Sequence, residues 1–261
     1  MTDSDPILVS EQKGGVLVLR LNRPEARNAF NPELMGDLGQ ALAGAEEDPD
    51  IRAVVLTGTG DRAFSAGMDL RAFASGDSNP TKEQQAGAVH FGRFVQGHIG
   101  IPIVGAANAT AVAGGFELLL GCDVVVASSA AKFGLPEAKR ALFAAGGGIF
   151  LATRIPLAVA LEMTLTGDTI DAERAYSLGL VNQVVAPDQV LDAGIAMAER
   201  IARNGPLALQ ATKELVRLAV SDAAKALEKQ AEWQPKVFNS DDAKEGATAF
   251  IEKRDPVWSG K

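Results

Sequence analysis

The stretch that decides the fold reads Ala111-Val112-Ala113-Gly114-Gly115-Phe116-Glu117-Leu118-Leu119-Leu120. A second stretch, Lys132-Phe133-Gly134-Leu135-Pro136-Glu137, follows it closely along the chain. Each places one glutamate among apolar residues and glycines, where an unpaired carboxylate is costly to bury. Two carboxyl groups that face one cavity can divide acid and base roles, because each raises the pKa of the other. The pair Glu117 and Glu137 therefore predicts chemistry of the kind that adds or removes water.

Two segments rich in small residues predict a set of backbone donors. In Phe64-Ser65-Ala66-Gly67-Met68-Asp69-Leu70, the glycine allows a sharp turn and lets a ligand approach the backbone N–H groups. The segment around Gly114 has the same property and also opens a helix, whose positive dipole end would face the ligand. Two such N–H groups that converge on one oxygen atom would form an oxyanion hole.

The composition is that of an ordinary globular protein and limits the classes of partner. The chain has 261 residues, of which 47% are apolar and 22% are charged, enough for a sizeable core. Its formal net charge of −8, without a dense Lys/Arg run, argues against nucleic acid or an anionic membrane as the main partner. No segment is apolar enough to span a bilayer. Because the single Cys122 permits no internal disulfide and residues 1–6 do not resemble a signal peptide, we expect a soluble, cytoplasmic protein.

Apolar runs alternate with helical patterns up to residue 205, which predicts a mostly parallel α/β architecture. Asn204-Gly205-Pro206 is the strongest hinge, because Gly ends one helix and Pro begins the next. We therefore divide the chain into a core, residues 1–205, and a helical region, residues 206–261. The expected strands are residues 15–21, 52–57, 102–107, 123–127 and 180–185, and the expected helices of the core are residues 32–47, 81–99, 115–121, 157–165, 171–178 and 187–203.

Several other features are interpreted as structural. Gly58-Thr59-Gly60-Asp61-Arg62-Ala63 fits the dinucleotide pattern G-x-G-x-x-A, but that pattern requires a helix to begin there, and another glycine turn follows instead. His90 and His98 lie in a predicted helix without nearby Cys or carboxylate ligands, so we expect no metal site. Asp123 is expected to be a structural hydrogen-bond partner and Trp258 a packing anchor.

Taken together, the glycine-rich and glutamate-bearing segments resemble the crotonase (enoyl-CoA hydratase/isomerase) superfamily. The resemblance continues through Cys122-Asp123, Leu165-Thr166-Gly167, Leu178-Gly179-Leu180-Val181 and Phe250-Ile251-Glu252-Lys253-Arg254, so it covers nearly the whole chain in order. It implies a crotonase-like spiral of repeated β-β-α units, followed by a C-terminal α-helical trimerisation region. In relatives this region builds homotrimers, which commonly pair into a dimer of trimers.

The resemblance implies an acyl-CoA thioester as the substrate and assigns the residues that would hold it. The thioester carbonyl would lie between the backbone N–H groups of Met68 and Gly114, and Glu117 and Glu137 would be the two catalytic acids. Coenzyme A would arrive as part of the substrate, so no separate cofactor and no metal is implied. The segments that hold coenzyme A in relatives, the last of them often from a neighbouring subunit, correspond here to Glu25, Ala26, Arg27, Ser65, Ala66, Asp69, Leu70, Arg71, Phe250 and Lys253.

Both glutamates are present, and in this superfamily that pairing separates hydratases from relatives that have lost one acid. The implied activity is that of an enoyl-CoA hydratase in fatty acid metabolism: the reversible syn addition of water to a trans-2-enoyl-CoA, which gives a 3-hydroxyacyl-CoA. The alternatives are a carnitinyl-CoA dehydratase acting on crotonobetainyl-CoA, an acyl-CoA double-bond isomerase, and a non-catalytic acyl-CoA-binding or RNA-binding relative. The two costly acids argue against a non-catalytic protein, and the charge of −8 argues against RNA.

One stretch departs from the pattern of common short-chain hydratases, which read Pro-Gly-Ala-Gly-Gly-Thr-Gln-Arg. Here Ala144 and Ala145 replace the Pro and the first Gly, and Ile149-Phe150-Leu151 replaces the Thr-Gln-Arg. This region helps to wall the acyl pocket in relatives, so the natural acyl chain is left open. Ala145 also stands where some isomerases carry an acid, which lowers the expectation of isomerase chemistry.

Overall fold

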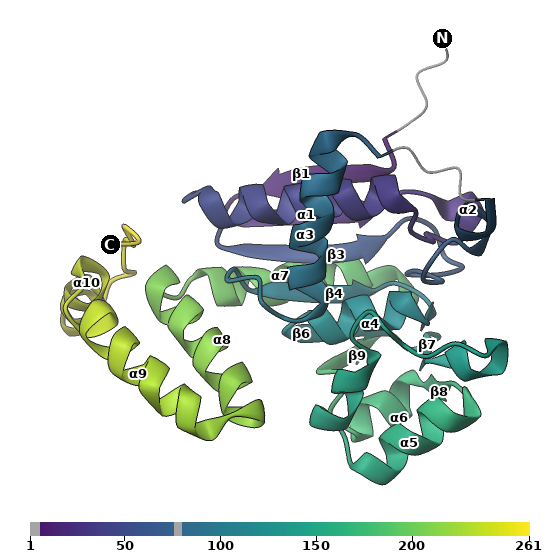
Figure 1. Cartoon of the computed structure of the whole chain (residues 1–261). Helices are drawn as coiled ribbons and strands as arrows, with labels where there is room; N and C mark the ends of the chain where they lie inside the picture. The colour runs from purple at the N-terminus through teal and green to yellow at the C-terminus, as the bar shows by residue number, and fades with distance from the viewer. Residues whose placement is uncertain (1–5, 76–79) are drawn as a thin grey trace.

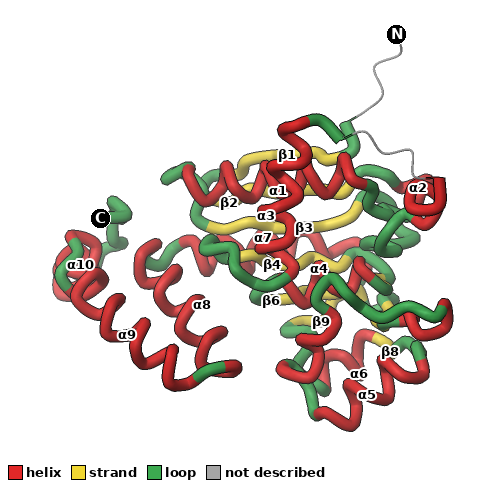
Figure 2. The backbone as a smooth tube through the Cα atoms, viewed as in Figure 1, coloured by secondary structure: helices red, strands yellow, loops and turns green. Residues whose placement is uncertain are grey.

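Two β-sheets organise the chain, of which the computed structural model describes residues 6–75 and 80–261. In the larger sheet β1 is antiparallel to β2, and the other neighbouring strands are parallel in the order β2-β3-β4-β6-β9 (Figure 2). The smaller sheet has the order β5-β7-β8. The strands are Leu8–Lys13 (β1), Val16–Leu21 (β2), Ala53–Gly58 (β3), Ile103–Ala107 (β4), Ala111–Val112 (β5), Val124–Ser128 (β6), Lys132–Gly134 (β7), Ile170–Asp171 (β8) and Gln183–Val185 (β9).

Helices connect the strands and continue alone after β9. The alternation of strands and helices confirms the predicted α/β class. The α-helices are Pro32–Glu47 (α1), Leu70–Ser75 (α2), Lys82–Val95 (α3), Gly114–Gly121 (α4), Leu157–Thr166 (α5), Ala172–Ser177 (α6), Val190–Ala202 (α7), Pro206–Ser221 (α8), Ala223–Phe238 (α9) and Asp241–Glu252 (α10). Short 3-10 helices are Pro24–Ala26 (η1), Pro136–Arg140 (η2), Gly148–Thr153 (η3) and Pro187–Gln189 (η4).

The large sheet is covered on both faces (Figure 1). Leu17, Leu19 and Leu21 of β2 join a hydrophobic cluster with side chains of α1, α3 and α4. The alternate residues Val16 and Val18 join a second cluster with α7. Successive strand residues point to opposite faces, so a strand buried on both sides is an unbroken apolar run. The same property explains why the apolar runs of the sequence predict the central strands.

The differences from the predicted elements have local causes. α1 begins as predicted, because Asn31 Oδ1 accepts a hydrogen bond from the N–H of Leu34 at 3.1 Å. The helix predicted at residues 81–99 ends at Val95, and the chain then turns through Gly97, whose φ is +74°. β1 and the small sheet are absent from the prediction, since β1 is mostly polar and exposed and the small-sheet strands have two or three residues each.

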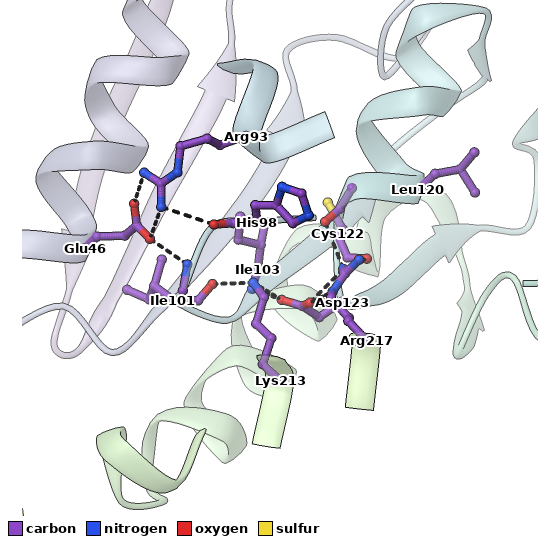
Figure 3. Close-up of polar contacts among 12 residues, drawn as sticks. Glu46, Arg93, His98, Ile101, Ile103, Leu120, Cys122, Asp123, Lys213 and Arg217 are labelled. Carbon is purple, nitrogen blue, oxygen red and sulfur yellow. Dashed lines mark hydrogen bonds and ion pairs between the residues drawn. The ribbon is translucent and has the colours of Figure 1, made fainter. Parts of the chain in front are cut away.

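A cluster of ion pairs fastens α8 to the large sheet (Figure 3). Asp123 Oδ2 accepts a hydrogen bond from the N–H of Ile103 at 2.8 Å and pairs with Lys213 Nζ at 2.7 Å. Its Oδ1 pairs with Arg217 at 2.7 Å. Lys213 also donates to the carbonyl of Ile101 at 2.7 Å. These bonds make Asp123 a structural residue, as expected from the sequence.

The C-terminal helices follow the hinge at Gly205, which is the N-cap of α8. α8 and α9 pack together and α10 lies beyond them, away from the sheets (Figure 1). None of the helices in the described ranges has the length and apolar character needed to cross a membrane. The division at residue 205 stays a prediction. Large apolar side chains are exposed along these three helices: Val216, Val220, Leu227, Phe238, Phe250 and Ile251.

Candidate active site

Glu117 is a buried carboxylate held by backbone N–H groups. It lies in α4, and only 6% of its surface is exposed. Its Oε1 accepts hydrogen bonds from the N–H of Gly146 at 2.9 Å and from that of Gly148 at 2.8 Å. Burial raises the pKa of Glu117, the backbone donors oppose this shift, and the charge of Glu137 adds to it. The side chain is thus fixed in position while its ionised form is made less stable than in water.

Glu137 provides a second carboxyl group within electrostatic range of the first. It lies in η2, directly after Pro136, and burial raises its pKa. The charge of Arg140 opposes that shift. In residues 6–75 and 80–261, its Oε2 is one of two buried side-chain oxygen or nitrogen atoms without a hydrogen-bond partner. An unsatisfied buried carboxyl oxygen is costly, which makes this atom a candidate to bind a ligand.

The turn at Gly67 and the start of α4 come into direct contact. The N–H of Phe30 donates to the carbonyl of Gly67, and the N–H of Asp69 donates to the carbonyl of Phe30, both at 2.9 Å. In this parallel bridge the N–H of Met68 points away from Phe30. Gly114 lies close to this turn: a methyl group added to Gly67 would come within 2.7 Å of its backbone nitrogen.

The N–H of Gly114 is the other expected donor. Gly114 is the first residue of α4, so its N–H has no partner within the helix. The preceding Ala113 adopts φ +52° and ψ −136°, a strained conformation for a residue with a side chain. Its own N–H is held by the carbonyl of Gly134 at 2.9 Å. The structure therefore brings together the two backbone segments of the predicted oxyanion hole.

Two of the expected coenzyme A segments are joined by hydrogen bonds. The N–H of Ala66 donates to the carbonyl of Arg27 at 3.0 Å. The hydroxyl of Ser65 donates to the carbonyl of Asn28 at 2.8 Å. Residues 25–27 and Ala66, which are far apart in the sequence, thus form a shared surface beside the Gly67 turn, whereas Ser65 is fully buried beneath it.

The other expected coenzyme A residues near this turn differ in their exposure and in their hydrogen-bond partners. Asp69 forms an ion pair with Arg23 at 3.0 Å and accepts a hydrogen bond from the N–H of Arg71 at 3.1 Å. Leu70 is 46% exposed. Glu25, beside Ala26, lines a small cavity of about 160 Å³. Asp69 therefore supports the local fold, and the exposed neighbours are the ones that could contact a ligand.

Phe250 and Lys253 are not brought to this surface within one chain. α10 lies at the opposite end of the molecule from α2 and β7 (Figure 1). Phe250 is 86% exposed. Lys253 follows the end of α10 with φ +56°. Contact between these residues and a ligand near Glu117 would require a second subunit, as the resemblance implies.

Three residues of this site are missing from the sequence-based prediction. Gly146 and Gly148 hold the Glu117 carboxylate, and the adjoining glycines of residues 146–148 are the signal that could have identified them. A methyl group added to Gly146 would lie 2.7 Å from Glu117 Oε2. The strain at Ala113 has no clear signal in the sequence, because alanine favours negative φ.

A cavity of about 580 Å³ lies elsewhere, between α8, α9 and the core. Lys213, Arg217 and Arg154 line it, but the first two pair with Asp123 and the third donates to the carbonyl of Leu120. No group of three His, Cys, Asp or Glu side chains in the described part of the chain is arranged to hold a metal ion. The paired glutamates are thus the best candidate for chemistry.

A spiral α/β core with a buried acid, a half-buried acid beside it and a crowded backbone turn is the arrangement expected of a crotonase-type protein. The chain belongs to the enoyl-CoA hydratase/isomerase family, whose sequence model matches residues 11–261.

Individual relatives match over almost their full length. Enoyl-CoA hydratase EchA19 of Mycobacterium tuberculosis is 40% identical, over 99% of this chain and 98% of the relative. Carnitinyl-CoA dehydratase of Proteus mirabilis is 35% identical, over 95% of this chain and 97% of the relative. The crystal structure of an enoyl-CoA hydratase from Mycobacterium tuberculosis superposes with a TM-score of 0.90 at 41% identity, covering 98% of this chain and all of the other. These matches confirm the crotonase fold.

Proposed function

We propose that this protein is an enoyl-CoA hydratase, which adds water reversibly and with syn geometry to a trans-2-enoyl-CoA. The observation that carries the proposal is the pair of neighbouring carboxyl groups: buried Glu117 is held by two backbone donors, and half-buried Glu137 has a buried oxygen atom without a hydrogen-bond partner among the described residues. Membership of the family and 40% identity to an enoyl-CoA hydratase support it.

The backbone donors would activate the substrate. With the thioester carbonyl between the N–H groups of Met68 and Gly114, electron density moves to the carbonyl oxygen and the β-carbon becomes electrophilic. Each donor stabilises the enolate-like oxygen more strongly than the neutral carbonyl, an effect of ~3 kcal/mol per donor in comparable sites. Coenzyme A is part of the substrate, so we propose no additional cofactor and no metal.

The two acids would then divide the proton transfers. Both hydrogen bonds to Glu117 end on Oε1, which leaves Oε2 to accept a proton from the attacking water. The water oxygen bonds to the β-carbon, and protonated Glu137 gives its proton to the α-carbon. Burial raises the pKa of Glu137 and so favours the protonated form that this step needs. Exchange with solvent resets both acids, and dehydration follows the same path in reverse.

We also propose that the active form is a homotrimer or a dimer of trimers. The exposed apolar side chains of α8, α9 and α10 support an interface between copies of the chain. In such an assembly Phe250 and Lys253 of one subunit would contact the coenzyme A bound by the next. Residues 25–27 and 65–71 would supply the rest of that binding surface.

We infer a cytoplasmic location and a role in fatty acid metabolism. The single cysteine, Cys122, is fully buried and permits no internal disulfide, which suits a reducing compartment. The acyl-CoA thioester chemistry supports the metabolic assignment.

The test of the activity is hydration of crotonyl-CoA, followed by the loss of its enoyl-thioester absorbance. We expect Glu117→Gln and Glu137→Gln each to lower kcat by ~10³-fold while acyl-CoA binding is retained. Glu162→Gln, at an exposed position of α5, is the matched control and should leave kcat unchanged. Near wild-type rates for both active-site variants would refute the proposal.

Carnitinyl-CoA dehydratase activity is the second candidate, favoured by the 35% identity to such an enzyme. Crotonobetainyl-CoA therefore belongs in the substrate panel beside crotonyl-CoA and longer enoyl-CoAs. The fastest substrate identifies the acyl class. Turnover of a 3-enoyl-CoA to its 2-enoyl isomer without hydration would instead support an isomerase.

A further inference from the structure

The last residues of the chain fold back onto the start of α10. Asp242, which is 6% exposed, accepts hydrogen bonds at its Oδ1 from the N–H and the hydroxyl of Ser259, at 2.6 Å and 3.0 Å. Its Oδ2 accepts one from the N–H of Gly260 at 3.0 Å. In return, the N–H of Asp242 donates to the carbonyl of Lys261 at 3.1 Å. We call residues 254–261 the tail; one buried carboxylate ties its end to α10.

Trp258 connects the tail to the rest of the molecule. Its Nε1 donates to the carbonyl of Arg203, at the end of α7, at 2.7 Å. Its own carbonyl accepts a hydrogen bond from Arg52, directly before β3, at 3.3 Å. The indole ring lies against two glycines, Gly205 at the hinge before α8 and Gly246 in α10. Methyl groups added to these glycines would come within 3.8 Å and 3.3 Å of ring atoms, respectively. Trp258 thus bridges α10, the hinge before α8 and the large sheet.

The beginning of the tail is also fixed. Arg254 binds Glu245 of α10 with two hydrogen bonds, of 2.6 Å and 2.9 Å. The N–H of Val257 donates to the same carboxylate at 2.8 Å. These bonds, led by those from Arg254, lower the pKa of Glu245 to about 2, so the contact persists across the physiological pH range.

α10 has little apolar packing of its own to hold it in place. Only Asp242 and Ala249 of this helix are buried. Phe250 and Ile251 are 86% and 77% exposed. The tail therefore holds α10 through the Asp242 and Glu245 carboxylates and the Trp258 ring, close to the exposed end of this helix.

We propose that Trp258 is a positioning residue, which latches α10 to the core so that Phe250 and Lys253 meet the nucleotide end of coenzyme A on a neighbouring subunit. The inference rests on the proposed function. Trp258 itself touches neither the substrate nor the glutamates. Its effect should therefore fall on recognition of the nucleotide and not on hydration of the double bond.

The test compares two thioesters of the same acyl group. Crotonyl-CoA carries the nucleotide, whereas crotonyl-pantetheine keeps the thioester and the pantetheine arm and lacks the nucleotide. The readout is the ratio of kcat/KM for the two substrates, which does not depend on how much of a variant is folded. We expect Trp258→Ala to lower this ratio about tenfold, through a higher KM for crotonyl-CoA, which corresponds to the loss of one or two contacts.

Two further variants separate the latch from a general loss of structure. Trp258→Phe keeps the ring contact but loses the bond to Arg203, so its ratio should lie between those of wild type and Trp258→Ala. Val257→Ala changes the neighbouring side chain, which is 77% exposed, and should leave the ratio at the wild-type value. In Trp258→Ala, hydrogen exchange should rise in α10 and stay unchanged in the part of α8 that contacts Asp123.

An unchanged ratio in Trp258→Ala would overturn the proposal, and so would an equal loss of kcat/KM for both thioesters. If wild-type protein hydrates neither thioester, the proposed function fails instead. The two failures are therefore distinguishable.

Discussion

Replacing Gly67 by alanine should disable the proposed oxyanion hole while leaving both glutamates intact. The added methyl group would lie 2.7 Å from the nitrogen of Gly114 and 3.0 Å from Cβ of Ala113. To restore an ordinary contact distance of 3.4 Å between the methyl group and the Gly114 nitrogen, the two backbone segments must move apart by about 0.7 Å. A donor ~2.9 Å from the carbonyl oxygen would then stand ~3.6 Å away, beyond hydrogen-bond length. Loss of one such donor corresponds to a decrease in kcat of ~10²–10³-fold, or ~3–4 kcal/mol.

The control for this variant is Gly179→Ala. Gly67 and Gly179 have φ values of +87° and +79°, so alanine at either position pays a similar conformational cost of ~1 kcal/mol. An added methyl group at Gly179 meets no atom of the described residues within 4 Å. Thermal unfolding measures the shared cost, and crotonyl-CoA hydration measures the difference. If Gly67→Ala keeps kcat within ~3-fold of Gly179→Ala, the proposed placement of the carbonyl is wrong.

Further predictions concern pH, stability and reactivity. Because burial raises the pKa of Glu117, kcat/KM should begin to fall with decreasing pH while the pH is still above the ordinary carboxyl pKa of 4.5. The same shift means that ionised Glu117 destabilises the folded protein, so Glu117→Gln should raise the Tm. This gain in Tm should be full above the raised pKa and should fade as the pH falls to 4.5. Lys213→Met should lower the free energy of unfolding, measured in urea, by ~2–3 kcal/mol, because it removes one of the two cations that pair with the largely buried Asp123. The control Lys244→Met, at an exposed ion pair, should change this free energy by less than ~0.5 kcal/mol. Cys122 is fully buried and its pKa is raised to about 12, so a thiol reagent should label it only at the rate of unfolding; rapid labelling of the native protein would contradict the buried position.

The sequence predicts the parts of the fold in which one pattern dominates. β3 and β4 are buried on both faces and are therefore recognisable as short apolar runs. The small sheet has no such pattern, because a strand of two residues such as β5 or β8 cannot show an alternation. Its pairing depends on contacts between segments that are distant in the sequence. The G-x-G-x-x-A pattern at residues 58–63 opens no helix, in agreement with its exclusion.

For the candidate site, residue types were more predictable than geometry. The apolar surroundings of Glu117 and Glu137 predict buried acids; the structure buries Glu117, leaves Glu137 half-buried and brings the two within electrostatic range. Their catalytic roles stay predictions. The contact between Gly67 and Gly114 depends on the path of two distant segments, so small residues alone could not establish it. The same holds for the tail, since its partners Arg52 and Arg203 lie in other parts of the chain.

The hydrogen bonds that hold Glu117 affect which residues of the neighbouring loop can change in evolution. Its partners at residues 146 and 148 are main-chain amides, which every residue type except proline possesses. Exposed side chains of this loop, such as Ala145, Ile149 and Phe150, can therefore be exchanged without depriving Glu117 of its hydrogen bonds. The loop thus presents backbone amides to Glu117 on its inner side and exposed side chains on its outer side. Libraries randomised at these three outer positions should thus yield hydratases of altered acyl preference far more often than inactive proteins.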